Sequence, residues 1–127
     1  MTRRLCLITG ASAGIGAEFA RQYAALGWDL ALTARRADRL ETLAGEVSGA
    51  HGIETLVIAE DLGAPDAPQR ILSAIEAKGR HVDALVNNAG YGLLGFFEKF
   101  FSDFIGIVFN NVYQFRFRHY NYIFPVL

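Results

Sequence analysis

The sequence predicts an α/β fold in which helices cover both faces of a parallel sheet. Short apolar runs alternate with longer stretches of helical period along the first part of the chain, which is typical of successive β-α-β units. The first apolar run, Leu5–Thr9, leads directly into the glycine-rich residues 9–16. Polar or glycine residues also follow the later runs. In a parallel sheet all of these positions lie at one edge, where α/β folds bind their ligands.

Composition indicates one globular domain over residues 1–127. The chain is 52% hydrophobic and 20% charged, and its net charge is −1. This charge gives no electrostatic basis for binding nucleic acid or an acidic membrane. No apolar run approaches the roughly 18 residues of a membrane span, and the run after the basic start is too short for a signal peptide. The single cysteine, Cys6, fits a reducing, cytoplasmic location.

Four strands are expected, of which the first is a continuous apolar run and the second places Leu30 and Leu32 on one face. Continuous apolar character suits parallel strands that are covered on both faces. The predicted strands are Leu5–Thr9, 28–34, Thr55–Ala59 and 83–86.

Three helices are expected between these strands, over residues 14–26, over residues 38–49, and from Asp66 to just before Gly79. Apolar residues at helical spacing should face the sheet; they are Ile15, Phe19, Tyr23 and Leu26 in the first helix, Leu40, Leu43 and Val47 in the second, and Ile71, Leu72 and Ile75 in the third. Gly27 should end the first helix. Asp66 and Gln69 have the spacing of a capping box, with Pro68 in the first turn.

The glycine-rich residues 9–16 fit a turn that holds an anion against the backbone. Gly10 permits a tight turn, Gly14 removes a side chain where a phosphate would approach, and Gly16 allows close packing of the helix on the sheet. The N–H groups at the helix start would then face a pyrophosphate. The alternative is an ordinary strand-to-helix turn with incidental glycines.

The residues after the second strand indicate which dinucleotide is preferred. Folds that bind NAD place a carboxylate there for the ribose 2′-hydroxyl, whereas this chain has Arg35 and Arg36. A guanidinium binds a 2′-phosphate in a bidentate manner, and Ser12 can add a hydroxyl. We therefore expect NADP(H) to be preferred over NAD(H). The alternative is that both arginines are solvated residues at a helix start.

These motifs resemble those of the short-chain dehydrogenase/reductase family, closely over residues 3–95. Residues 9–16 are similar to the family's Thr-Gly-x-x-x-Gly-x-Gly loop, residues 87–90 to its Asn-Asn-Ala-Gly turn, and Asp61 with Leu62 to the pair that meets the adenine ring. A weaker similarity places Asn111 as the family asparagine that holds a proton-relay water. The resemblance implies a Rossmann-type three-layer fold with strand order 3-2-1-4. The residues expected to bind the cofactor are Thr9, Gly10, Ser12, Ala13, Gly14, Ile15, Gly16, Arg35, Arg36, Asp61, Leu62, Asn88, Ala89 and Gly90.

The resemblance also implies hydride transfer between NADP(H) and a small carbonyl or alcohol substrate, but the family's catalytic residues are not found. The only lysines are Lys78 and Lys99, and neither completes the family's Tyr-x-x-x-Lys pattern. Ser102 lies too close to Gly90 to be the family serine. The chain thus resembles a truncated, cofactor-binding half. The alternative is a non-catalytic dinucleotide-binding module that acts through a protein partner.

The divergent tail, residues 96–127, is rich in phenylalanine and tyrosine and contains no alanine. Its spacing favours a helix over residues 102–117, and no part of it has the pattern of a strand. The fourth strand should therefore be a sheet edge, which predicts self-association of the chain. His119 has no second candidate ligand nearby and makes no case for a metal.

Overall fold

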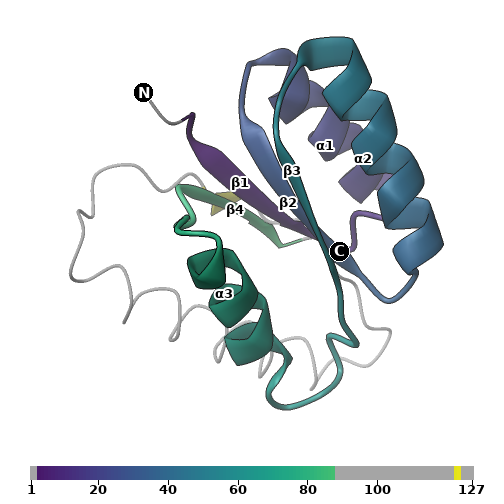
Figure 1. Ribbon diagram of the computed structural model, residues 1–127. Helices are drawn as coiled ribbons and strands as arrows, with labels where there is room; N and C mark the ends of the chain where they lie inside the picture. The colour runs from purple at the N-terminus through teal and green to yellow at the C-terminus, as the bar shows by residue number, and fades with distance from the viewer. Residues whose placement is uncertain (1–2, 88–121, 124–127) are drawn as a thin grey trace.

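The computed structural model describes residues 3–87 and 122–123, and these form an α/β domain (Figure 1). The elements in chain order are β1 (Leu5–Thr9), α1 (Gly14–Ala25), β2 (Asp29–Ala34), α2 (Ala37–His51), β3 (Thr55–Ala59), α3 (Ala67–Ala77), β4 (Ala84–Asn87) and β5 (Tyr122–Ile123). The four predicted strands and three predicted helices in the first 87 residues are present, with boundaries within two residues of those expected. None of the described helices is long and apolar enough to cross a membrane.

The strands of the described sheet have the order β3-β2-β1-β4-β5, and all the pairings are parallel. This confirms the predicted order 3-2-1-4 and the Rossmann-type fold. Strand β1 lies between β2 and β4, with Leu7 opposite both Ala31 and Leu85. Because the strands are parallel, a connection between neighbours must cross a face of the sheet, and the three described connections from β1 to β4 each contain a helix.

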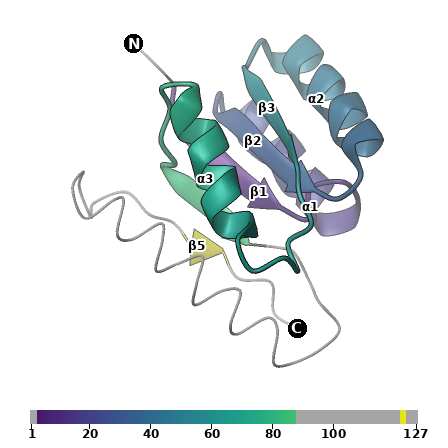
Figure 2. The ribbon, with the colours of Figure 1, turned by 60° about the horizontal axis from the view of Figure 1, so that its bottom comes forward.

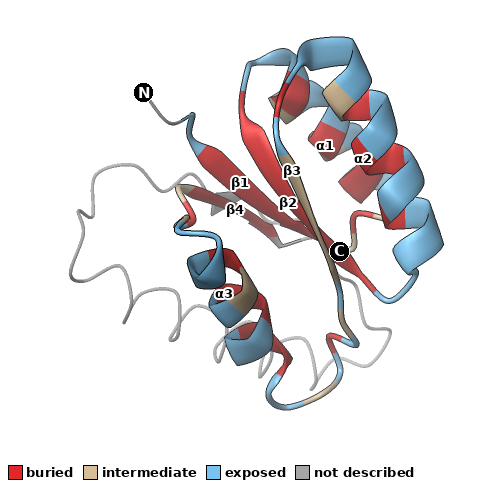
Figure 3. Cartoon of the chain, in the orientation of Figure 1, coloured by how far each residue is buried: buried red, intermediate tan, exposed pale blue. Residues whose placement is uncertain are grey.

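Helices α1 and α2 cover one face of the sheet and α3 covers the other (Figures 1 and 2). Each face of the sheet has its own hydrophobic core, and alternate residues of β1 and β2 point into one or the other. Cys6, Ile8, Leu30 and Leu32 pack with α1 and α2, whereas Leu5, Leu7 and Ala31 pack with α3. Burial on both faces leaves β1 and β2 fully buried, while the outer faces of the helices are exposed (Figure 3). This explains why β1 is apolar from Leu5 to Ile8 and why β2 places apolar residues on both of its faces.

The predicted inward face of α1 was wrong by one position. Ile15 is 63% exposed and Leu26 is 74% exposed, whereas the buried residues of the helix are Gly16, Ala17, Ala20 and Ala24. Small side chains at helical spacing allow the helix axis to approach the sheet closely, and the larger residues then lie beside the contact. Phe19 and Tyr23 are partly buried at its margin. The inward residues predicted for α2 and α3 are all buried.

The predicted capping box of α3 is not formed. Asp66 is the N-cap residue, but its side chain makes no capping hydrogen bond and instead pairs with Arg70 one turn further on. The backbone at Asp66, with φ −100° and ψ 6°, is not the extended conformation of a capping residue. Gln69 donates to the hydroxyl of Ser73 at 3.3 Å rather than turning back. The Asp66 side chain is therefore bound to Arg70 and not to the first N–H groups of α3.

The prediction that β4 forms a sheet edge was also wrong. Residues of the tail form β5, in which Tyr122 lies opposite Leu85 and Ile123 opposite Val86. A strand of two residues is too short to show a periodic pattern, and its position depends on a contact distant in sequence. The described sheet therefore ends at β3 and β5. The helix predicted over residues 102–117 lies outside the described residues.

Candidate functional site

The carboxyl ends of the first four strands meet at one edge of the sheet. Thr9, the last residue of β1, lies opposite Thr33 in β2 and Asn87 in β4, and Ala34 at the end of β2 lies opposite Ala59 in β3. The glycine-rich turn and the segments that contain Arg35 and Asp61 therefore all start from the same edge. The sequence prediction that these motifs share one edge is confirmed for the described residues.

The glycine-rich turn uses two left-handed residues. Gly10 has φ 64° and Gly14 has φ 59°, a conformation that residues with a Cβ rarely adopt. Between them the chain is extended at Ala13, with φ −160° and ψ 167°. The N–H of Ala11 donates to the carbonyl oxygen of Thr33 at 3.2 Å and so ties the turn to β2. The turn thus has a fixed backbone that only glycine at positions 10 and 14 permits without strain.

The turn opens onto free space at the start of α1. A Cβ added to Gly14 would meet no described atom within 4 Å, and residues Ala13, Gly14 and Ile15 are exposed. The N-cap residue Ala13 offers no side-chain cap to the helix. The first N–H groups of α1 are therefore available to an outside acceptor, with the positive end of the helix dipole behind them. This accessible backbone fits a phosphate group, as the sequence predicts.

Two arginines follow β2 at the same edge. Arg35 and Arg36 are exposed, and Arg36 is the N-cap residue of α2. The Arg36 Nε atom lies 3.9 Å from a carboxylate oxygen of Asp38, with both side chains more than half exposed. Arg35 has neither a hydrogen bond nor an ion pair with any residue that the structure describes. Its guanidinium is thus uncommitted and can meet an anion.

Asp61 and Leu62 follow β3 and lie in different environments. One carboxylate oxygen of Asp61 accepts the N–H of Gly63 at 2.9 Å, which fixes the turn while the side chain stays exposed. Leu62 is 4% exposed and belongs to the core beneath α3. The neighbouring Glu60 accepts hydrogen bonds from Nε and Nη2 of Arg70, at 2.9–3.0 Å. Of the two acids after β3, Asp61 is the one that leaves a carboxylate oxygen for a ligand.

A cavity of about 260 Å³ lies between α1 and α2, beside the glycine-rich turn. Its lining residues are Ser12, Ala17, Arg21, Asp38, Arg39, Thr42, Leu43 and Glu46. Ser12 was expected at the nucleotide site, whereas Arg39 was not singled out from the sequence. Arg39 is the third residue of α2, and Asp38 is the acidic residue of the same turn; a cation in the first turn of a helix is unfavourable by itself.

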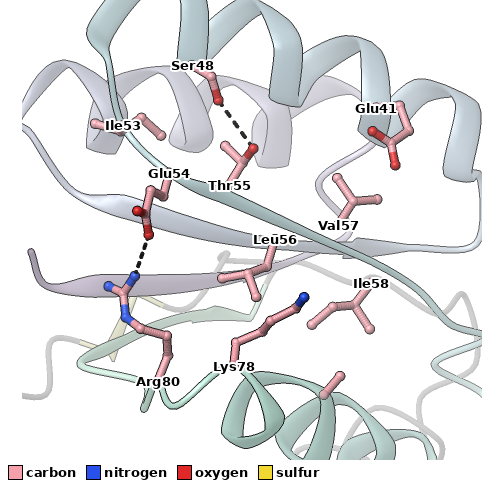
Figure 4. Close-up of a pocket in the computed structure, with 11 residues that line it drawn as sticks. Glu41, Ser48, Ile53, Glu54, Thr55, Leu56, Val57, Ile58, Lys78 and Arg80 are labelled. Atoms are coloured by element: carbon pink, nitrogen blue, oxygen red, sulfur yellow. Dashed lines mark hydrogen bonds and ion pairs between the residues drawn. The ribbon is translucent and has the colours of Figure 1, made fainter. Parts of the chain in front are cut away.

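A second cavity, of about 670 Å³, lies along the outer edge of β3 and contains none of the predicted site residues. Figure 4 shows two pairs of its polar side chains in contact: the hydroxyls of Ser48 and Thr55 are 3.2 Å apart, and Arg80 donates to Glu54 at 3.1 Å. Lys78 extends over the apolar side chains of β3. The cavity lies along the half-exposed edge strand β3 and away from the glycine-rich turn, so we place the candidate site at the carboxyl edge and not here.

The remaining predicted site residues, Asn88, Ala89, Gly90 and Asn111, lie outside the described residues. The described part of β4 ends at Asn87, which directly precedes them.

Comparison with known proteins finds matches to dehydrogenases and reductases. The family model for short chain dehydrogenases matches residues 4–113. Serine 3-dehydrogenase of Agrobacterium fabrum is 46% identical over 88 residues, which are 68% of this chain and 33% of that protein. The crystal structure of L-sorbose reductase from Gluconobacter frateurii, complexed with NADPH and L-sorbose, matches with a TM-score of 0.68 and 33% identity, over 72% of this chain and 35% of that one.

A third relative extends the match further along the chain. A short-chain dehydrogenase from Sphingobium yanoikuyae, in complex with NADPH, has a TM-score of 0.75 and 28% identity, over 87% of this chain and 49% of its own. The chain spans about a third of the length of the curated relatives that it matches. Together with the parallel sheet and its glycine-rich turn, these matches show that the chain belongs to the short-chain dehydrogenase/reductase family.

Proposed function

We propose that this chain is the cofactor-binding part of an oxidoreductase that transfers hydride between NADP(H) and a small carbonyl or alcohol substrate. The observation that carries the proposal is the glycine-rich turn at the end of β1. Two glycines with φ near 60° lead into an uncapped helix start, next to the uncommitted Arg35. Two structural relatives are complexes with NADPH, which supports the choice of cofactor. We further propose residues 1–127 as a single dinucleotide-binding domain, in a reducing cytoplasmic setting that suits the lone Cys6.

Each described part of the edge has a proposed role. The N–H groups at the start of α1 bind the pyrophosphate, and Gly14 leaves room for it. Arg35, with Arg36 and Ser12, binds the 2′-phosphate of NADP(H). Asp61 hydrogen-bonds the adenine ring and Leu62 forms part of the wall beside it. For Asn88, Ala89, Gly90 and Asn111 the roles rest on the family resemblance alone.

The nicotinamide ring supplies the hydride chemistry when it is bound; the proton must come from the protein. In the family a tyrosine with a lysine four residues later supports this step, and the 127-residue sequence contains no such pair. We therefore propose that this chain binds the cofactor without turning over a carbonyl substrate. The same observation supports the second candidate, a dinucleotide-binding module that acts through a protein partner. Steady NADPH oxidation by the pure chain with a panel of carbonyl compounds would rule out this module.

The test of cofactor binding is Gly14→Val with Gly79→Val as a matched control. Both glycines have positive φ, 59° and 69°, and a Cβ at either meets nothing within 4 Å. Each variant therefore carries a similar backbone strain, on the order of 1–2 kcal/mol. Only Gly14 lies at the proposed phosphate site, because Gly79 precedes β4 at the opposite end of the sheet.

We expect Gly14→Val to lose at least tenfold in NADPH affinity, measured by isothermal titration, because a β-branched side chain occupies the space of the pyrophosphate. Gly79→Val should lose a similar amount of stability but keep its NADPH affinity within about twofold, because backbone strain far from the site does not change a contact with the ligand. Equal affinities of the two variants would show that the turn is only structural.

A further inference from the structure

The cavity between α1 and α2 contains one charge that no described residue balances. Arg21, on the α1 side, donates to Glu46 of α2 at 2.8 Å, and this contact raises the pKa of Arg21 and lowers the pKa of Glu46. On the α2 side, Asp38 faces Arg36 at 3.9 Å. Arg39 lines the same cavity and has no ion pair or hydrogen bond within residues 3–87 and 122–123. Its guanidinium is therefore the unpaired cation of this cavity.

The position of Arg39 makes this lack of a partner unfavourable. Arg39 is the third residue of α2, where the N–H groups and the helix dipole already present positive charge. Arg35 and Arg36 precede it within four residues, and Asp38 is the one acidic residue of the first turn. An anion in front of these groups would be attracted by all of them at once. The local arrangement is thus stabilised when a dianion binds and is strained by like charges when none does.

The opposite wall of the cavity belongs to the glycine-rich turn. Ser12 is a half-buried residue of this turn and lines the cavity together with Arg39. Thr42 is also in the lining, but its hydroxyl donates to the carbonyl oxygen of Asp38 at 3.0 Å. The cavity therefore joins the turn proposed to bind the pyrophosphate to the first turn of α2, and Arg39 supplies its uncommitted positive charge.

We infer that Arg39 is a specificity-determining residue, whose guanidinium binds the 2′-phosphate of NADP(H) from the α2 side, opposite Ser12. This inference rests on the proposed function and adds a residue to its 2′-phosphate site. Arg35 then meets the phosphate from the end of β2 and Arg39 from the helix. The exposed guanidinium of Arg39 interacts with the 2′-phosphate and not with the rest of the cofactor. Arg39 therefore strengthens the binding of NADP(H) and leaves the affinity for NAD(H) unchanged.

The experiment measures the dissociation constants of NADPH and NADH for the 127-residue chain and for Arg39→Gln, by isothermal titration at low salt. We expect the NADPH affinity to fall about tenfold, the equivalent of one charged hydrogen bond at an exposed site, with NADH changed by less than twofold. The pair 2′,5′-ADP and 5′-ADP should repeat this difference without the nicotinamide. Arg39→Lys should retain part of the preference, because it keeps the charge but loses the bidentate geometry.

Arg21→Gln is the matched control, since Arg21 lines the same cavity but is already paired with Glu46; its NADPH to NADH ratio should stay within twofold of the parent chain. The inference is overturned if Arg39→Gln keeps the NADPH to NADH affinity ratio of the parent chain while Arg35→Asp lowers that ratio. The proposed function then still stands. Equal weakening of both cofactors in Arg39→Gln would show a structural role and also overturn it. If the parent chain binds neither cofactor, the proposed function fails as well, and Gly14→Val will show no loss.

Discussion

Replacement of Arg80 by methionine should cost about 3 kcal/mol of the free energy of unfolding. Arg80 is 12% exposed at its side chain and lies 3.0 Å from Asp29, which is 3% exposed. Without Arg80 the buried carboxylate of Asp29 keeps the N–H of Glu54, at 2.8 Å, as its short contact, and Arg3 lies 3.9 Å away. Removal of one partner from a buried ion pair typically costs 3–5 kcal/mol, and the remaining hydrogen bond places the expected loss at the lower end.

The assay is equilibrium unfolding in urea, with Arg21→Met as the matched control. Arg21 also binds a carboxylate at 2.8 Å, but both side chains of this pair are about half exposed, so its loss should cost at most about 1 kcal/mol. Asp29→Asn removes the buried charge and keeps an oxygen for Glu54. Asp29→Asn should therefore restore part of the free energy of unfolding when it is combined with Arg80→Met. The reasoning is refuted if Arg80→Met and Arg21→Met lose the same stability, or if Asp29→Asn destabilises both backgrounds equally.

Four further results are expected. Arg35→Asp should weaken NADPH binding by about 1.5–3 kcal/mol, the worth of one charged hydrogen bond, and spare NADH; an unchanged ratio of affinities would show that Arg35 does not touch the phosphate. The pure chain should oxidise no NADPH with any ketone, because the roughly 10²–10⁴-fold contribution of a general acid is absent; steady turnover would mean that a tail tyrosine has taken this role. Burial raises the pKa of Cys6, so the thiol of the folded chain should resist alkylation, and rapid labelling at neutral pH would contradict this expectation. The free energy of unfolding should also fall as the pH rises above about 9, because the thiol then ionises in the unfolded chain alone. Self-association stays a prediction, now resting on the edge strands β3 and β5, and a stable monomer in sedimentation at several concentrations would oppose it.

The elements of the first 87 residues could be predicted because their signals are local. A buried parallel strand such as β1 needs a continuous apolar run, and the sequence Leu5–Thr9 contains one. The end of α1 needs a left-handed residue after it, and Gly27 has φ 85°. In both cases the residue type and the conformation depend on neighbours within a few positions, so a single sequence was sufficient.

The predictions that failed depended on contacts that the local sequence does not contain. Two stripes of helical period run along α1, one of large residues and one of small, and only the distance between helix and sheet decides which faces inward. The small stripe that includes Ala20 and Ala24 lies against the sheet, and Leu26 stays exposed. The pairing of β4 with Tyr122 likewise depends on a contact across more than thirty residues.

The carboxylates at the amino ends of the strands and the arginines at the carboxyl ends differ in their partners, and this difference supports the location of the site. At the amino ends, Asp29 binds Arg80, and an oxygen of Asp83 accepts the N–H of Leu5 at 2.9 Å, so these two carboxylates are paired within the protein. At the carboxyl ends, Arg35 and Arg39 lack a partner among the described residues, although they lie beside the positive ends of two helices. The paired carboxylates at one end hold the strand connections together, whereas the exposed guanidinium groups at the other end can meet an anion. Natural sequences depart from local consistency mainly where a function requires it. The unpaired guanidinium groups of Arg35 and Arg39 therefore indicate an anionic ligand at the carboxyl edge without reference to the family motifs, and Arg35 is the residue that both lines of evidence share.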